Sequence, residues 1–316
     1  GTIMSDRLAA MQLFLAVVEE GSLSSASRRL GVPLTTVSRT LAALERELGV
    51  GLLTRTTRRS EPTEAGSRYA AACRRILESV EEAEREVAGE YAAPKGELVI
   101  AAPSVFGRLH LLPVVTQILA RFPEIDIQLV LPDRYVDLVG DHVDLALRIG
   151  VMPDSELIAR SVGEVRPVCC ASPAYLASRG RPGHPDELRG HDCIGFDGAL
   201  PGREWPFLIG GQRRSLAMRP RLVVNTAEAA IDAAVAGAGI TRVLSYQVAA
   251  AVERGQLEPV LQAFELPPSP VRLVHAMRGL APQKLKAFMD FAAPRLRTRL
   301  TVLDADGSRR ESLPGT

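Results

Sequence analysis

The sequence predicts an α/β protein in which an all-α N-terminal domain and a long connecting helix precede a two-lobed α/β domain. Three observations predict this organisation. The chain has 316 residues, which is too long for one ordinary core. Helical periodicity fills the first sixty residues, whereas strand-like and helix-like segments alternate after about residue 95. Hydrophobic residues make up 46% and charged residues 24%, as in a globular rather than a disordered chain.

Three helices separated by glycine turns are predicted before residue 50. A stripe with helical spacing marks the first helix, formed by Met11, Phe14, Leu15 and Val18. Ser22 and Ser24 supply N-cap candidates for a short second helix, which Gly31 ends in a left-handed turn. Pro33 opens the third helix and Gly49 closes it. Two helices joined by such a turn, over about residues 23–42, predict a helix-turn-helix.

The segment from residue 23 to residue 60 is basic, because it holds seven arginines and two glutamates. Residues 52–55 and 59–62 are predicted to form two strands of a wing, which completes a winged domain over residues 5–62. Wing arginines suit phosphates or a minor groove, and the polar start of the third helix suits base edges. A merely solvated basic face is the alternative. The predicted DNA-binding residues are Ser24, Leu34, Thr35, Thr36, Ser38, Arg39, Arg55, Arg58 and Arg59.

Six short motifs at fixed spacings extend through this region. They are Gly21-Ser22-Leu23-Ser24-Ser25-Ala26, Leu30-Gly31-Val32, Val37-Ser38-Arg39, Leu44-Glu45-Arg46-Glu47-Leu48-Gly49, Leu53-Thr54-Arg55-Thr56 and Thr63-Glu64-Ala65-Gly66. Together they resemble the signature of LysR-type bacterial transcription regulators, and so many spacings make the match specific. The family often has Ser-Gln-Pro where this chain has Pro33-Leu34-Thr35. The amide that commonly reads adenine is therefore missing, and the operator sequence of relatives does not transfer.

A long helix is predicted over residues 63–93, with Thr63 as its cap and Pro94 as its end. Its apolar positions follow a heptad spacing: Tyr69, Cys73, Ile76, Val80, Ala83 and Val87. A narrow stripe of this kind predicts a homodimer through this linker helix, which would present two winged domains to a two-fold operator. The alternative is that the stripe packs only on its own chain. The family resemblance also implies a dimer, and a homotetramer is expected from it.

After Lys95 the pattern predicts two α/β lobes. The predicted strands are 97–102, 125–131, 144–149, 165–171 and 271–277, and the predicted helices are 107–122, 135–141, 172–179, 227–236 and 282–293. Such alternation predicts mostly parallel sheets, and Pro294 is expected to end or kink the last helix. Crossings near residues 163–164 and 265–268 separate lobe I (95–163 and 268–300) from lobe II (164–267). This resembles the periplasmic-binding-protein-like effector domain of LysR-type regulators, followed by a flexible tail over residues 301–316.

A small-molecule effector, anionic or polar, is expected in the cleft between the lobes, where strand ends meet helix N-termini. The predicted effector-binding residues are Ser104, Val105, Phe106, Arg148, Phe196, Asn225 and Thr226. The alternatives are plain helix capping for Ser104 and Thr226, and ordinary core packing for Phe196. For Arg148 the alternative is an ion pair with Asp133 or Asp144.

Other features point away from catalysis. The five histidines are scattered, and the sequence shows no nucleophile with a base, no cofactor motif and no metal-ligand spacing. The glycines at 236–240 are read as a helix end and turn, because they follow a helix instead of a strand. Buried hydrophobic positions are expected for Cys73, Cys169, Cys170 and Cys193, with a redox pair that includes Cys193 as the alternative. An enzyme is therefore not predicted.

These observations predict a sequence-specific, DNA-binding transcription regulator that responds to an effector. The alternative is an oligomeric regulator that binds DNA independently of any effector. Expected partners are double-stranded DNA, the small-molecule effector, a second copy of the chain and RNA polymerase. The sequence contains no apolar run that approaches about 18 residues and begins with no signal-peptide pattern, so a cytoplasmic location without membrane contact is expected.

Overall fold

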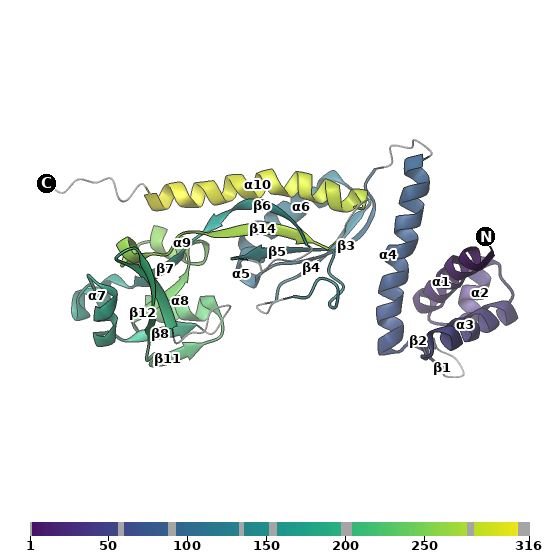
Figure 1. Cartoon of the computed structure of the whole chain (residues 1–316), viewed down its shortest axis with the longest axis horizontal. Coiled ribbons are helices and arrows are strands. Elements are labelled where there is room, and N and C mark those ends of the chain that lie inside the picture. The colour runs from purple at the N-terminus through teal and green to yellow at the C-terminus, as the bar shows by residue number, and fades with distance from the viewer. Residues whose placement is uncertain are drawn as a thin grey trace. The chain divides into compact units, whose positions relative to one another are not determined.

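The computed structural model describes residues 2–55, 60–87, 93–132, 136–151, 157–196, 204–276 and 281–308. The chain divides into two compact units, Gly1–Ala93 and Pro94–Thr316 (Figure 1). The first unit contains α1 (Thr2–Glu20), α2 (Leu23–Leu30), α3 (Leu34–Leu48), β1 (Leu53–Arg55), β2 (Ser60–Pro62) and α4 (Glu64–Val87). Its core is formed by side chains from every helix, including the fully buried Phe14, Val37, Leu41 and Leu44.

The predicted helix-turn-helix is confirmed in its local details. Ser22 caps α2, since its hydroxyl accepts a hydrogen bond from the Ser25 N–H at 3.1 Å. Gly31 has a φ of 64° and ends α2 in the left-handed region that glycine adopts without strain. Ser27 ties the turn from inside, because its hydroxyl donates to the Val32 carbonyl at 2.6 Å. The small residue and the glycine thus fix the angle at which α3 leaves α2.

The wing is held to both of its neighbouring helices. β1 and β2 pair in antiparallel register. Glu45 of α3 accepts hydrogen bonds from the N–H groups of Leu52 and Leu53 at 2.7 and 3.1 Å. Thr63 donates through its hydroxyl to the Gly51 carbonyl and accepts from the Gly66 N–H, which caps α4 as predicted. A Cβ at Gly66 would lie 1.9 Å from the Leu52 carbonyl oxygen, so this close approach requires glycine.

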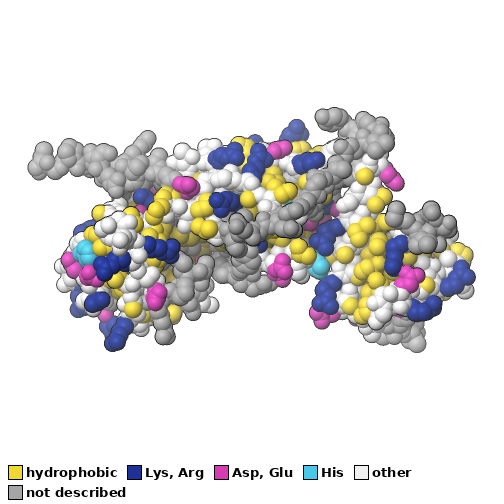
Figure 2. Space-filling model, viewed as in Figure 1, with side chains coloured by type: hydrophobic (Ala, Val, Ile, Leu, Met, Phe, Trp, Pro, Cys, Tyr) yellow, Lys and Arg dark blue, Asp and Glu magenta, His cyan; other side chains and the backbone are white. Residues whose placement is uncertain are grey.

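The apolar stripe of α4 is packed in the core of its unit at one end and exposed at the other. The Tyr69 ring lies 5.6 Å from Phe14, and Cys73 is fully buried in the core of the same unit. Further along, Ile76 is 42% exposed and Ala83 is also exposed. Figure 2 shows hydrophobic side chains following the length of α4 on the face turned to the viewer. Of the five predicted seam positions whose side chains are described, Tyr69 and Cys73 pack within their own unit, and the exposed part of the stripe begins at Ile76, whereas the side chain of Val87 lies outside the described residues.

In the described residues of the second unit, the strands form two five-stranded sheets and a separate hairpin. The lobe I sheet has the order β4-β3-β5-β14-β6, from β3 (Gly96–Ala101), β4 (Ile125–Val130), β5 (Leu145–Ile149), β6 (Ile158–Val165) and β14 (Ser269–His275). It carries α5 (Ser104–Phe106), the π-helical η1 (Gly107–Leu111), α6 (Leu112–Arg121) and α10 (Gln283–Ser308). Figure 1 shows α10 lying along this lobe beside β6 and β14.

The lobe II sheet has the order β11-β8-β12-β7-β13. Its strands are β7 (Pro167–Ala171), β8 (Cys193–Phe196), β11 (Leu222–Val224), β12 (Ile240–Leu244) and β13 (Glu258–Val260), and a separate hairpin is formed by β9 (Glu204–Ile209) and β10 (Gln212–Ala217). The helical segments are α7 (Pro173–Arg179), η2 (Pro185–Gly190), α8 (Ala227–Val235), α9 (Ser245–Glu253) and η3 (Gln262–Phe264). The chain passes between the lobes at Arg166 and again over residues 265–268. The second crossing was predicted, whereas the first lies a few residues later than expected.

The sheets are mixed, so the prediction of mostly parallel sheets was wrong. In lobe I, β3 pairs in parallel with β4 and β5, but β14 pairs antiparallel with β5 and β6. In lobe II, β8 pairs in parallel with β11 and β12, but β7 pairs antiparallel with β12 and β13. All these antiparallel pairs involve β7 or β14, the first strand after each crossing between the lobes. The chain enters each sheet in the opposite direction after a crossing, and the spacing of apolar residues along the sequence carries no information about strand direction.

In lobe I, one further prediction was wrong and one strand was missed. Residues 138–140 form a turn, so the helix predicted over 135–141 is absent from its described part, 136–141. β6 was not predicted. Its Gly163 has a φ of 147° and leaves room for Leu300, whose Cδ1 would lie 2.5 Å from a Cβ there.

The helix α10 continues through Pro294 to Ser308, so it does not end near residue 293, which was one of the two expected effects of Pro294. Burial of Phe288, Ala292, Leu296 and Leu300 along one face explains this, because core packing outweighs the one hydrogen bond that proline removes. Residues 309–316 of the predicted tail lie outside the described residues.

Candidate nucleic-acid interface and effector site

The recognition face of α3 is formed by its N-terminal turn and the turn that follows. Leu34 is 46% exposed, and Thr35 and Arg39 are also exposed. Thr36 and Ser38 are half-buried, whereas Val37 on the opposite side of the helix is fully buried. The polar half of α3 therefore faces outward because its apolar half is fixed in the core.

The remaining predicted DNA-binding residues come from α2 and the wing. Ser24 is exposed in the first turn of α2. Arg55 ends β1, and its backbone pairs with Ser60 of β2. Arg58 and Arg59 lie outside the described residues, as does the side chain of Arg55. Whether the wing arginines join Thr35 and Arg39 at one surface thus stays a prediction.

The basic charge counted in the sequence is partly neutralised within the fold. Arg29 lies 2.7 Å from a Glu19 carboxylate oxygen and 3.2 Å from one of Glu20, and the hydrogen bond to Glu19 raises the pKa of Arg29. Arg28 is exposed, and its guanidinium donates to the hydroxyl of Ser25, which leaves its charge uncompensated in the described contacts. Arg28 therefore faces solvent as a cation, whereas Arg29 ties α2 to the end of α1.

One functional residue was missed from the sequence. Glu45 was counted only as a negative charge that offsets the arginines, yet its carboxylate is the acceptor that joins α3 to the start of β1. The backbone N–H groups of Leu52 and Leu53 follow the end of α3 and lie at the start of the wing, where neither a helix nor the β1–β2 pairing supplies both with an acceptor. That requirement, together with an acid one turn before Gly49, was the signal that could have identified Glu45 as a positioning residue.

The predicted effector residues on lobe I play different roles. Ser104 is half-buried at the start of α5. Val105 and Phe106 are buried in the main core, so their side chains contribute packing. The Phe106 ring lies 5.2 Å from Tyr246 of α9 and 5.1 Å from His110. Phe106 thus joins lobe I to lobe II and does not line an open surface.

On lobe II, Thr226 is the cap of α8, since its hydroxyl accepts from the Ala229 N–H at 3.2 Å. Phe196 ends β8 and is partly buried against the main core, which agrees with the packing alternative. Asn225 is exposed and lies directly before Thr226.

Arg148 of β5 donates to the Val136 carbonyl at 2.9 Å. The Asp144 carboxylate accepts from the Val99 N–H at 2.8 Å, so Asp144 is engaged by the backbone. Asp133, the other partner considered for Arg148, lies outside the described residues.

The two helix starts that were expected to meet an effector lie near each other. Arg108, in the turn after Ser104, approaches Glu228, in the turn after Thr226, with a nitrogen-to-oxygen distance of 3.8 Å. Both side chains are about half exposed, so this is a weak contact across the lobes. Ser104 and Thr226 are thereby brought to the same region from different lobes.

A buried histidine lies beside this region. His110 is 8% exposed, and neither of its ring nitrogens has a hydrogen-bond partner among the described residues. Burial lowers the pKa of His110 to about 4, and the charge of Arg299 contributes in the same direction. The imidazole is therefore neutral at pH 7.

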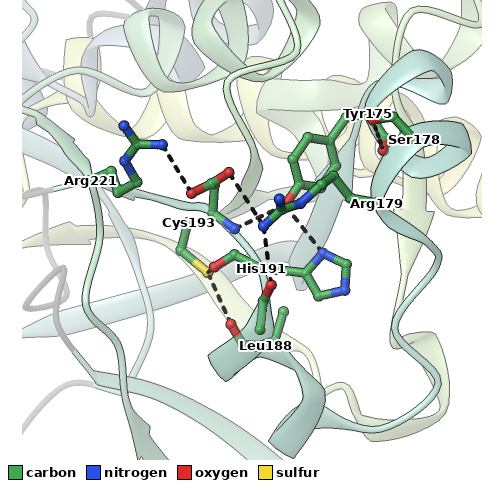
Figure 3. A network of polar contacts seen from close by, with 9 residues as sticks. Tyr175, Ser178, Arg179, Leu188, His191, Cys193 and Arg221 are labelled. Atoms are coloured by element: carbon green, nitrogen blue, oxygen red, sulfur yellow. Dashed lines mark hydrogen bonds and ion pairs between the residues drawn. The ribbon is translucent and has the colours of Figure 1, made fainter.

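Lobe II contains a separate polar network (Figure 3). The Tyr175 hydroxyl lies 3.1 Å from Nδ1 of His191 and accepts a hydrogen bond from the Asp192 N–H at 2.9 Å. Arg179 and Arg221 flank the Asp192 carboxylate at 3.8 and 3.4 Å. These contacts join α7 to the chain that enters β8, so their role is structural.

The cysteines do not resemble a reactive pair. All four are buried as free thiols, which agrees with the packing interpretation. Burial raises the pKa of Cys170 to about 12 and that of Cys193 to about 11. Burial also raises the pKa of Cys169. Since the thiolate is the reactive form, these pKa values oppose nucleophilic chemistry.

The glycine turn at 236–240 is confirmed as the end of α8, with φ of 84° at Gly237 and 146° at Gly239. Among the described residues, His, Cys, Asp and Glu side chains do not gather in any group of three or more that could hold a metal ion. Within the same residues, none of the helices combines the length and the apolar character that crossing a membrane requires.

Comparison with known proteins agrees with both units. Residues 8–67 match the family described as bacterial regulatory helix-turn-helix protein, lysR family, and residues 92–297 match the LysR substrate binding domain. An HTH-type transcriptional regulator of Xanthomonas campestris pv. campestris is 36% identical over 288 residues, which cover 90% of this chain and 84% of that protein.

Solved structures of full-length regulators are also similar. CrgA, a LysR-type transcriptional regulator from Neisseria meningitidis, is 32% identical with a TM-score of 0.59, covering 91% of this chain and 98% of CrgA. The Vibrio cholerae virulence activator AphB is 30% identical with a TM-score of 0.58, covering 90% and 98%. The exposed α3, the two-lobed second unit and these matches lead to one conclusion: the chain belongs to the LysR family and is a DNA-binding transcriptional regulator with an effector-binding domain.

Proposed function

We propose that this regulator binds a two-fold operator as a homodimer and changes its DNA binding when a small molecule occupies the cleft between lobes I and II. LysR-type regulators bind DNA and small-molecule effectors and form oligomers. The observation that carries the effector part of the proposal is the approach of Arg108 to Glu228, which brings the starts of α5 and α8 together. Free N–H groups at helix starts favour an anionic or polar effector.

The proposed domain limits follow the sequence prediction. They are a winged domain over 5–62, a linker helix over 63–93, and an effector domain over 95–300 with lobe II between the two crossings. The division of the chain between Ala93 and Pro94 supports the boundary between the linker helix and the effector domain. Assembly into a homotetramer, contact with RNA polymerase and a cytoplasmic location belong to the same proposal.

The DNA-binding residues in this proposal are those of the exposed α3 face, Ser24 and the three wing arginines. Thr35, Thr36 and Arg39 would meet base edges, while Arg55, Arg58 and Arg59 would meet phosphates. Selection of duplexes from a random pool by the full chain tests this. Recovery of a sequence with two-fold symmetry is expected, and recovery of unrelated sequences would contradict specific binding.

The effector site is tested by thermal unfolding of the full chain in a panel of small carboxylic acids. A ligand that binds only the folded state raises its stability by about 2.7 kcal/mol when present at 100 times its Kd. At least one acid should raise the melting temperature, and Ser104→Ala or Thr226→Val should abolish that response. If every acid leaves the melting temperature unchanged, the effector-independent alternative gains support.

A matched control separates ligand contact from helix capping. Ser172 caps α7 of lobe II by accepting from the Tyr175 N–H at 3.2 Å, much as Thr226 caps α8. Ser172→Ala should therefore lower stability by a similar amount, about 1 kcal/mol, while the response to the acid persists. If Thr226→Val behaves in the same way as this control, Thr226 is only a cap.

A further inference from the structure

The outer face of α2 is formed by Ser24 and Arg28, which are both exposed and lie one helical turn apart. The opposite side of the helix packs inward, since Ala26 is fully buried in the core of the first unit. A third side faces α1, where Arg29 pairs with two glutamates. Arg28 and Arg29 are therefore adjacent in the sequence but lie in different surroundings.

The Arg28 guanidinium is held by a short network of serine hydroxyls. Its Nη2 donates to the Ser25 Oγ at 3.0 Å, and the Ser22 hydroxyl donates to the same oxygen at 3.0 Å. The Ser25 N–H donates in turn to the Ser22 Oγ at 3.1 Å, which is the cap of α2. The guanidinium thus lies back over the first turn of α2, the direction in which long side chains lean on a helix.

Carboxylates are absent from the sequence around Arg28. From Gly21 to Leu44 the chain contains neither aspartate nor glutamate, so α2 and most of α3 carry only basic charges. Among the described residues, the hydrogen bond to Ser25 is the only polar contact of the Arg28 guanidinium. Arg29, in contrast, is compensated by carboxylates of α1. Of the two arginines of α2, Arg28 is therefore the one that offers a cation to an anionic partner.

We propose that Arg28 holds a phosphate of the DNA backbone, with Ser25 as the positioning residue that orients its guanidinium. In a helix-turn-helix the second helix enters the major groove while the first crosses the backbone, and α2 is that first helix. Contacts with phosphate oxygens fix the position of a protein on the duplex but read no sequence. Arg28 thus adds a phosphate contact on α2, separate from the contacts expected of the wing. The alternative is that Arg28 only fastens the serine network, which would leave the salt dependence of DNA binding unchanged.

The salt dependence of binding to a fluorescein-labelled duplex of random sequence tests the proposal. Arg28 holds phosphate on any sequence, so the test needs neither the effector nor the two-fold operator of the proposed function. Relative to the wild-type full-length protein, Arg28→Ala should weaken binding severalfold at low salt. The slope of log K against log salt should fall in magnitude by roughly 0.9 for each bound protomer, and thus by roughly 1.8 for the proposed homodimer. Fluorescence anisotropy over a series of potassium chloride concentrations measures both effects.

Arg29→Ala is the matched control, because it removes the same charge one residue away. The Arg29 guanidinium is already paired with carboxylates of α1, so its loss should leave the slope unchanged. Arg28→Lys keeps the charge and should keep most of the slope. An unchanged slope in folded Arg28→Ala would overturn the proposal. An equal reduction in Arg29→Ala would do the same, since the total charge of the domain, and not a contact by Arg28, would then set the slope.

Ser25→Ala tests the orienting role of the serine. It removes the acceptor of the Arg28 guanidinium without changing any charge, so the affinity should fall while the slope stays close to that of the wild type. In the Arg28→Ala background the same substitution should have little further effect, because the two residues act through one contact. An equally large effect in both backgrounds would show that Ser25 acts independently of Arg28 and would overturn its positioning role. Circular dichroism checks that each variant folds.

Discussion

Arg39 has two possible roles in DNA binding: it can read a base, or it can hold a phosphate and so position the protein on the DNA. It is exposed one turn beyond Thr35 on α3, where a guanidinium reaches either the two acceptors of guanine or one phosphate. We expect base reading, because three wing arginines are available for phosphates. Arg39→Ala should then cost about 1–3 kcal/mol on the selected operator and relax the preference at one position.

The measurement is the Kd of wild type and Arg39→Ala for the operator and for a random duplex at one salt concentration. A larger loss on the operator supports base reading. Equal losses on both duplexes would assign Arg39 to a phosphate and leave specificity to Thr35 and Thr36.

Glu45 should position the wing without touching DNA. Glu45→Ala leaves the N–H groups of Leu52 and Leu53 without this acceptor, which should lower the free energy of unfolding by about 1–3 kcal/mol. The start of the wing would also lose its anchor on α3, so affinity should fall about equally for operator and random DNA. Urea unfolding and both Kd values check this. Glu45→Gln, which keeps an acceptor oxygen, should lose less of each, and normal binding by destabilised Glu45→Ala would contradict the positioning role.

His110 predicts a pH dependence of stability. Its pKa in the folded state is about 4, below the ordinary value of 6.5, because burial disfavours the imidazolium. Between these pKa values the unfolded chain binds the extra proton, so this contribution to stability is present above about pH 6.5 and is lost as the pH falls towards 4. The charge of Arg299 lowers this pKa further, and the rings of Phe106 and Tyr246, whose centroids lie 5.1 and 5.9 Å from that of the imidazole, supply no negative charge. His110→Gln should flatten the decline in unfolding free energy between pH 7 and pH 4, as measured by urea titration.

Among the elements, those defined by local signals were predicted well. The Ser22 cap and the glycines at the ends of α2 and α3 act within one helical turn, so the sequence suffices to place them. Helix α10 and β6 were mispredicted because buried partners decide them, as with Leu300 against Gly163. The same limit applies to the proposed effector residues. A strand end followed by a helix is the local signal that predicts Ser104 and Thr226, but only the packed lobes reveal that Phe106 lies against Tyr246.

The linker helix α4 gives a test of the dimer. Tyr69 and Cys73 pack in their own unit, so the surface for a second chain runs from Ile76 through the half-buried Val80 to Ala83. Val80→Asp places a charge in that surface and should convert dimers to monomers in sedimentation velocity, since an unpaired buried charge is costly. Ser79→Asp is the matched control, because Ser79 is exposed and its hydroxyl bonds to the Arg75 carbonyl within the helix. Unchanged sedimentation of Val80→Asp would move the interface away from α4.

For the molecule as a whole, net charge conceals the feature that matters for DNA. The chain carries a formal charge of only +1, with 38 basic and 37 acidic residues, yet the segment from residue 23 to residue 60 holds seven arginines against two glutamates. Part of that excess is internal, because Glu19 and Glu20 pair with Arg29. The cations expected at phosphates are therefore few and confined to the winged domain.

That confinement predicts a measurable salt dependence. Each phosphate neutralised on duplex DNA contributes a slope of about −0.9 to log K against log salt. If Arg55, Arg58 and Arg59 each meet one phosphate, a dimer should show a slope of roughly −5, and Arg58→Ala with Arg59→Ala should reduce its magnitude by roughly 3.6. Titrations of operator binding from low to high potassium chloride measure both slopes. A flat plot for the wild type, or an unchanged slope in the double variant, would show that the wing is not the surface that holds the phosphates.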